Sequence, residues 1–186
     1  MKISDFVAID FELFTPYHLS ACSIGAVKVI NDTIVEKYYT LINPVPDEHT
    51  FKEMNTKVHG LTLNMVKNAP TFNKVFPHLA NMIGDLPIVC HNRSTDINVL
   101  SKCMEFFGLS GIDVDNNYCT YEKTGLSLAD ACKKYGINII GPNSLGITDS
   151  HSLLNASFSQ IMPPTGNIAF ISQSGAMTVA IIDWSV

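Results

Sequence analysis

Two carboxylates interrupt an apolar stretch near the amino terminus, and they are the residues with the clearest chemical potential in this sequence. Residues 6–12 are apolar except for Asp10 and Glu12, which stand two positions apart. Because residues i and i+2 of a β-strand project from the same face, the two carboxylates would lie side by side. Buried acids require a neutralising cation, and carboxylate oxygens suit Mg²⁺ or Mn²⁺. The pair therefore predicts a divalent-metal site; the alternative is a strand end at which both acids reach water.

A third acid follows a second short apolar run. Ile88–Cys90 predicts a buried strand, and the polar segment after it leads into a helix with Ser94 as the expected N-cap and Gly108 at its end. That helix is predicted from apolar residues at helical spacing, namely Ile97, Leu100, Met104 and Phe107. Asp96 would lie in its first turn, at the exit of a strand. An acid there either complements the helix dipole or joins the first pair in binding a metal.

Composition and charge exclude several classes of protein. The 186 residues suffice for one core of about 150 residues. A net charge of −5 argues against a broad electrostatic grip on nucleic acid, so such binding must be local and metal-assisted. With neither a signal sequence nor a run long enough to span a bilayer, we expect a cytoplasmic protein with no membrane partner. The 5 cysteines contain no Cys-x-x-Cys pair, so neither a disulfide framework nor zinc is indicated.

The elements that must position the three acids follow from apolar periodicity. Three strands joined as an antiparallel meander precede alternating short strands and helices, which predicts an α/β fold with a mixed sheet flanked by helices. Asn31-Asp32 is a turn of hairpin length between the second and third strands. Strands are expected at 5–12, 21–30, 33–42, 88–90 and 117–120, and helices at 51–58, 72–83, 94–107 and 126–135.

Several blocks together resemble the DEDD-type 3′–5′ exonucleases, a group that includes the proofreading epsilon subunit of bacterial DNA polymerase III. Residues 7–12 resemble the first motif, 58–62 the family's His-Gly-Ile-Thr segment, 89–96 the second motif, and 126–137 the helix before the third. The resemblance covers about residues 3–137. It implies a ribonuclease-H-like fold and hydrolysis of a phosphodiester at a 3′ end with two Mg²⁺ or Mn²⁺ ions.

The resemblance also implies roles for individual residues. Asp10, Glu12 and Asp96 would be the metal ligands and catalytic carboxylates. The backbone around Phe11 and the side chain of Leu13 would contact the terminal nucleotide. Three polar residues, His59, His91 and Asn92, would lie near the substrate strand; the alternative for each is an ordinary polar residue of a loop or strand end.

The third motif of the family is missing from its expected place. The family has a histidine, the general base for the attacking water, and a carboxylate five residues later. The nearest imitation is His151, which is followed four positions later by the amide of Asn155. We expect His151 and Asp149 to be loop residues; the alternative for His151 is a catalytic role. Activity should therefore be weak or absent.

The carboxyl-terminal segment has a different character. All 12 Lys and Arg residues lie at or before Lys134, which places a boundary near residue 136. Residues 137–186 resemble NDP-forming acyl-CoA synthetases, relatives of the succinyl-CoA ligase alpha subunit, so we interpret the chain as a chimera of domains 1–136 and 137–186. A buried strand at 168–172 and a helix from Ser174 would form a short Rossmann-like fragment. The free N–H groups there could hold a phosphate through Ser172, Ser174 and Gly175.

Three functions remain open at this stage. The first is a metal-dependent 3′–5′ exonuclease that acts on single-stranded DNA ends, releases nucleotide monophosphates and works with a replicative polymerase in proofreading. The second is a non-catalytic module that binds nucleic-acid ends through the same cleft. The third is a fragment that binds CoA or phosphate through 172–176.

Overall fold

A computed structural model describes residues 3–45, 59–137, 146–152, 154–157, 162–171 and 175–185. The chain divides into two compact units, one formed by 1–57 with 61–127 and the other by 58–60 with 128–186. The helix expected at 51–58 lies outside the described residues. No helix within the described ranges is long and apolar enough to cross a membrane.

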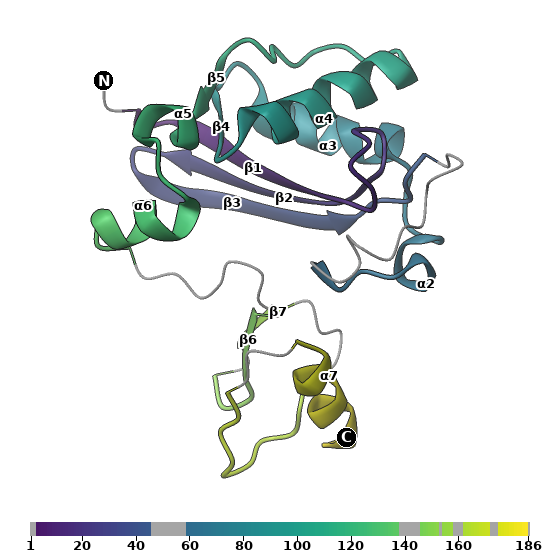
Figure 1. The fold of residues 1–186 in the computed structure, drawn as a ribbon, viewed down its shortest axis with the longest axis vertical. Coiled ribbons are helices and arrows are strands. Elements are labelled where there is room, and N and C mark those ends of the chain that lie inside the picture. Colours follow the sequence, from purple (N-terminus) through teal and green to yellow (C-terminus); the bar gives the residue numbers. More distant parts are fainter. Residues whose placement is uncertain are drawn as a thin grey trace. The chain divides into compact units, whose positions relative to one another are not determined.

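The first unit is built on a five-stranded mixed sheet (Figure 1). Its strands are β1 (Phe6–Leu13), β2 (Ala21–Ile30), β3 (Thr33–Leu41), β4 (Ile88–Cys90) and β5 (Asn117–Cys119), in the order β3-β2-β1-β4-β5. β1, β2 and β3 pair antiparallel, whereas β4 pairs in parallel with both β1 and β5. The predicted arrangement of three antiparallel strands followed by parallel ones is confirmed.

The turn between β2 and β3 is the predicted two-residue hairpin. Asn31 and Asp32 both adopt positive φ, 51° and 59°. Such a turn matches the right-handed twist of the strands that flank it, and Asn and Asp tolerate this backbone region better than other residues with side chains. The local sequence thus specifies the hairpin that joins β2 and β3.

Two helices, α3 (Phe72–Ile83) and α4 (Arg93–Phe107), lie together on one face of the sheet (Figure 1). α3 has the predicted bounds. Gly108 ends α4 in a left-handed conformation, as predicted, but the N-cap is Asn92 and not Ser94. The helix begins earlier because the Asn92 carbonyl accepts the N–H of Asp96 at 3.0 Å. α2 (Leu63–Val66) and α5 (Thr120–Thr124) complete the helices described in this unit, and α5 was not predicted.

The core lies between the helices and the sheet. Alternate residues of β1 point into it, and Phe72 of α3 packs 6.3 Å from Phe11, measured between ring centroids. Its fully buried members include Val7, Ile24, Leu79, Met82, Ile88, Val99 and Leu100. The period-two alternation that buries Ile9 and Phe11 leaves Asp10 and Glu12 on the other face.

The second unit contains α6 (Leu128–Lys134), β6 (Gly146–Asp149), β7 (Leu154–Ser157) and α7 (Gly175–Trp184), with β6 and β7 paired antiparallel. The predicted helix from Ser174-Gly175 is confirmed as α7. The strand predicted at 168–172 is wrong for its described part, because Ile168 is 94% and Ile171 96% exposed and neither is paired. An apolar run becomes a strand only when another strand lies alongside to accept its hydrogen bonds.

Candidate active site

Asp10 and Glu12 extend from the face of β1 that lies opposite α3 and α4. Their neighbours Ile9 and Phe11 are buried in the core, whereas Asp10 is exposed and Glu12 half-buried. Each is paired to a small residue of β2, Asp10 to Gly25 and Glu12 to Ser23. The strand register therefore places two carboxylates on one face with little side-chain bulk beside them.

Asp96 reaches the same strand from α4. Within β1, only Val7 and Ala8 pair with β4, so among the described strands the edge of β1 beyond Ala8 has no partner on that side. There the amide N–H of Phe11 donates a hydrogen bond to Oδ1 of Asp96 at 3.0 Å. Asp96 is only 4% exposed. This buried bond holds the third carboxylate against the backbone between Asp10 and Glu12, although 85 positions separate Phe11 from Asp96 in the chain.

Burial raises the pKa of all three carboxylates, and for Glu12 and Asp96 the charges of neighbouring acids add to the rise. Burial raises the pKa of Glu12 to about 7, and the negative charges of Asp10 and Asp96 add to the effect. Burial likewise raises the pKa of Asp96 to about 7; the Phe11 N–H opposes this rise and the charge of Asp10 adds to it. The pKa of Asp10 is also raised, because its carboxylate is surrounded by protein although the residue is exposed. The charge of His91 opposes this rise without cancelling it. A cation would relieve this repulsion.

The donor set suits a hard divalent cation, since three carboxylates offer oxygen ligands and negative charge. Among the described residues, however, no group of three His, Cys, Asp or Glu side chains is already close enough to ligate one ion. The Asp96 carboxylate is turned to the Phe11 amide. Metal binding would therefore require the side chains to turn toward a shared ion.

His91 lies beside Asp10 at the end of β4. The pairing of β4 with β1 ends at Ala8 and Val89, and His91 follows β4 directly. Its charge lowers the pKa of Asp10, which indicates that the two side chains are near each other. Its Nδ1 lies 2.8 Å from Oγ1 of Thr120, a residue that the sequence analysis did not single out. Asn92 is the N-cap of α4, and its Oδ1 accepts a hydrogen bond from Ser94.

The structure places the other predicted site residues as follows. The Phe11 side chain is in the core and its N–H is bound to Asp96, while Leu13 packs partly buried against the core. His59 belongs to the second compact unit. His151 lies in the turn after β6, where its Nε2 is 3.1 Å from the Gly166 carbonyl and Asp149 accepts its N–H. Gly175 begins α7, and Ser172 and Ser174 lie outside the described residues.

Comparison with known proteins finds two kinds of relative. The Exonuclease (RNase_T) family model matches residues 7–142. The PolC-type DNA polymerase III of Thermotoga maritima is 32% identical over 115 residues, which cover 61% of this chain and 8% of the polymerase. An ADP-forming acetate–CoA ligase of Archaeoglobus fulgidus is 43% identical over 58 residues, which cover 31% of this chain and 8% of the ligase. The chain thus spans less than a tenth of either relative, and both predicted resemblances are confirmed.

Solved structures share the fold. The nuclease domain of 3′hExo, a DEDDh family member bound to rAMP, aligns with a TM-score of 0.59 at 13% identity, covering 75% of this chain and 82% of that domain. Exonuclease X in complex with 5′ overhanging duplex DNA aligns with a TM-score of 0.53 at 23% identity, covering 75% and 78%. The predicted ribonuclease-H-like fold is therefore confirmed. Since the family model matches well over half of the sequence, the chain belongs to the RNase T family of DEDD 3′–5′ exonucleases.

Proposed function

We propose that this chain is a metal-dependent 3′–5′ exonuclease that removes nucleotide monophosphates from single-stranded DNA ends, with Asp10, Glu12 and Asp96 as its metal ligands. The observation that carries the proposal is the hydrogen bond from the Phe11 N–H to Asp96. It brings an acid that is remote in sequence to the strand bearing the other two. Proteins of the same fold solved with rAMP and with 5′ overhanging duplex DNA support nucleic acid as the general class of substrate.

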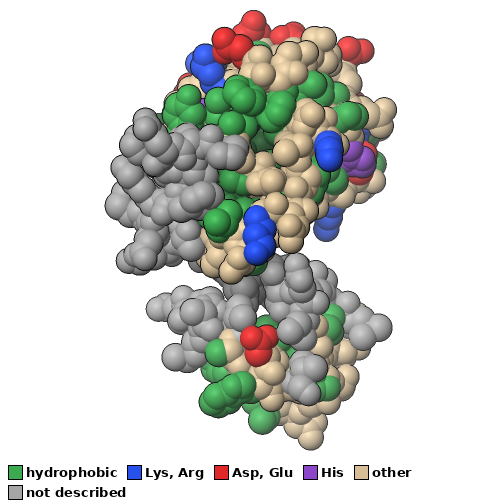
Figure 2. Space-filling model, turned by 90° about the vertical axis from the view of Figure 1, so that its right-hand side faces the viewer, with side chains coloured by type: hydrophobic (Ala, Val, Ile, Leu, Met, Phe, Trp, Pro, Cys, Tyr) green, Lys and Arg blue, Asp and Glu red, His purple; other side chains and the backbone are tan. Residues whose placement is uncertain are grey.

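In this proposal the side chains of the protein bind the metal ions and orient the substrate strand. Asp10, Glu12 and Asp96 supply the oxygen ligands for Mg²⁺ or Mn²⁺, and the Phe11 amide limits the rotation of Asp96. When bound, such an ion polarises the phosphate and makes an attacking water more acidic. We assign to His91, whose Nδ1 lies 2.8 Å from Oγ1 of Thr120, the role of contacting the substrate strand near Asp10. Figure 2 shows Lys and Arg scattered singly on the face it draws, which agrees with local rather than broad binding.

We further propose that activity is impaired by the loss of the third motif. His151, the alternative candidate for the base, belongs to the second compact unit, and its Nε2 lies 3.1 Å from the Gly166 carbonyl. A general base typically contributes about 10²–10⁴-fold to a rate, so the chain should hydrolyse slowly. The seam between domains 1–136 and 137–186 remains part of this proposal; similarity to ADP-forming ligases over 58 residues supports it, although the exonuclease match extends to residue 142.

The test is release of mononucleotide from a 3′-labelled single-stranded oligonucleotide with Mn²⁺, with DNA and RNA substrates compared. We expect slow release by the wild type, loss of release in Asp10→Asn and Asp96→Asn, and no effect in Asp85→Asn, an exposed acid outside the site. Release that persists in Asp10→Asn would contradict the proposal. Retention of the oligonucleotide without any release would favour the second candidate, a non-catalytic end-binding module, which the missing base and fourth acid make the main competitor.

A third candidate, a fragment that binds CoA or phosphate, rests on the similarity to ADP-forming CoA ligases. Its test is calorimetry of the whole chain with CoA and, separately, with inorganic phosphate. We expect no heat in either titration, since the apolar segment that should support the phosphate loop, including Ile168 and Ile171, is exposed. Saturable heat with CoA would favour the ligase-like function for the tail.

A further inference from the structure

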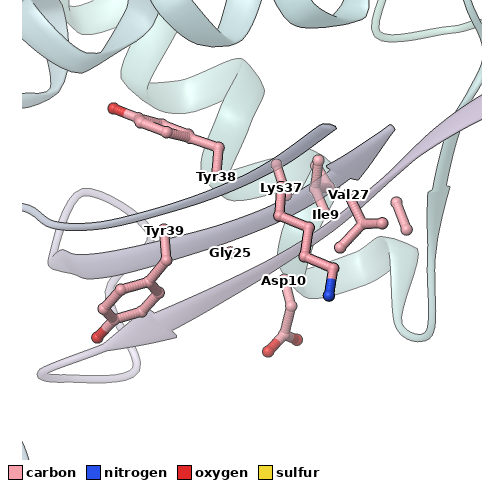
Figure 3. Close-up of a pocket in the computed structure, with 9 residues that line it drawn as sticks. Ile9, Asp10, Gly25, Val27, Lys37, Tyr38 and Tyr39 are labelled. Carbon is pink, nitrogen blue, oxygen red and sulfur yellow. The ribbon is translucent and has the colours of Figure 1, made fainter. Parts of the chain in front are cut away.

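The sheet face opposite α3 and α4 carries two rows of side chains beside the candidate active site. In one row Asp10 of β1 pairs with Gly25 of β2, which pairs with Tyr39 of β3. In the next row Ala8 of β1 pairs with Val27 of β2, which pairs with Lys37 of β3. Figure 3 shows Asp10, Lys37 and Tyr39 extending to one side of the sheet and Tyr38 to the other. Groups from three strands thus face a common space.

Gly25 opens a hollow in the middle of these rows. A Cβ built on Gly25 would have no heavy atom within 4 Å, although Gly25 stands in the row between Asp10 and the large residue Tyr39. The hollow has a volume of about 520 Å³ and is bounded by Asp10, Lys37 and Tyr39 together with strand residues. Ligand sites commonly enclose about 300–1,000 Å³, so the space is of the right order for one nucleotide.

The chemistry around the hollow has an aromatic part and a cationic part. Tyr39 is 49% exposed, so part of its ring is open to solvent on this face. Lys37 is exposed and has no carboxylate within ion-pair distance among the residues described. A base can stack on a tyrosine ring, and an ammonium group attracts a phosphate that three nearby carboxylates would repel.

We propose that Gly25, Lys37 and Tyr39 form a subsite for one nucleotide of the substrate strand, with its base against Tyr39 and its phosphate at Lys37, adjoining the scissile position at Asp10. This inference rests on the proposed nuclease function, because the subsite would hold the DNA strand whose end lies at the candidate active site. A strand held on this face would offer its next phosphate to the three acids.

Binding without cleavage tests the subsite separately from catalysis. Fluorescence anisotropy of a labelled single-stranded DNA oligonucleotide in EDTA gives the affinity of the whole chain. We expect Tyr39→Ala to weaken binding about tenfold, and Tyr39→Phe to retain it, since stacking needs the ring and not the hydroxyl. Unchanged affinity in Tyr39→Ala would overturn the assignment.

The lysine is tested by salt dependence with a matched control. Lys37→Ala should weaken binding and lower the slope of log affinity against log salt by about 0.7, the value for one phosphate contact with a single strand. Lys28→Ala removes the same charge from the helix-covered face, where Lys28 pairs with Val7, and should leave the slope unchanged. Equal slopes in the two variants would refute a phosphate contact at Lys37.

Gly25→Val fills the hollow without strain in a strand. We expect weaker oligonucleotide binding with an unchanged melting temperature. A lowered melting temperature or altered oligomeric state with unchanged binding would mean that protein, not nucleotide, covers this face, and would overturn the subsite.

If the wild type binds through these residues yet releases no nucleotide, the subsite stands and the nuclease proposal fails. If release is normal in all three variants, only the subsite fails.

Discussion

The buried carboxylates should make the stability of the metal-free protein depend on pH. In an unfolded chain Asp96 and Glu12 titrate near pH 4, whereas in the folded protein the pKa of each is raised to about 7. The folded state therefore binds more protons across this interval. The contribution of these two groups to stability is therefore fully present below about pH 4 and is lost as the pH rises through 7.

The magnitude follows from the shift of Asp96. A rise from 3.8 to about 7 in a residue that is 4% exposed corresponds to about 4 kcal/mol at 1.36 kcal/mol per pKa unit. Glu12 retains solvent access and the two acids repel each other, so their shifts do not add. We expect a net loss of about 2–3 kcal/mol, or about 5–10 °C in melting temperature, from pH 4.5 to 7.5.

Asp96→Asn isolates this contribution. The amide oxygen still accepts the Phe11 N–H, but the charge is gone, so the variant should melt several degrees above the wild type at pH 8 in EDTA. Calorimetry from pH 4.5 to 8, with Asp85→Asn as the exposed control, measures the difference. Mn²⁺ should raise the melting temperature of the wild type and not that of Asp96→Asn. Parallel pH profiles for wild type and Asp96→Asn would refute the argument that Asp96 is a buried, destabilised charge.

Three further substitutions test the scaffold by urea unfolding followed by circular dichroism. Leu79→Ala, at a fully buried position of α3, should cost about 2–5 kcal/mol, and a loss below 1 would contradict the packing of α3 on the sheet. Gly108→Ala should cost about 1 kcal/mol because the α4 C-cap has φ 63°; unchanged stability would argue against a left-handed cap there. Asp32→Val should cost about 1–2 kcal/mol at φ 59° in the hairpin turn, whereas Asp32→Gly should be tolerated.

Much of the first unit could be predicted from the sequence because its signals are local. The alternation in residues 6–12 is a strand period, the apolar spacing of 72–83 is a helical period, and Asn31-Asp32 fits a hairpin turn. These patterns reflect backbone geometry and the burial of one face, which act over a few residues. The same local reasoning failed at 168–171, where hydrophobicity suggested a strand but no neighbouring strand pairs with it in the described structure.

The sequence by itself determined that three acids stand at a strand and at a helix start, and that the blocks around them belong to a nuclease family. Only the tertiary structure decided that Asp96 binds the Phe11 amide, that His91 is near Asp10, and that Gly25 separates Asp10 from Tyr39. Cross-strand register and the premature end of β4 produce these neighbours. Both depend on pairing between distant segments, and no periodicity within a single segment records which partner it will meet.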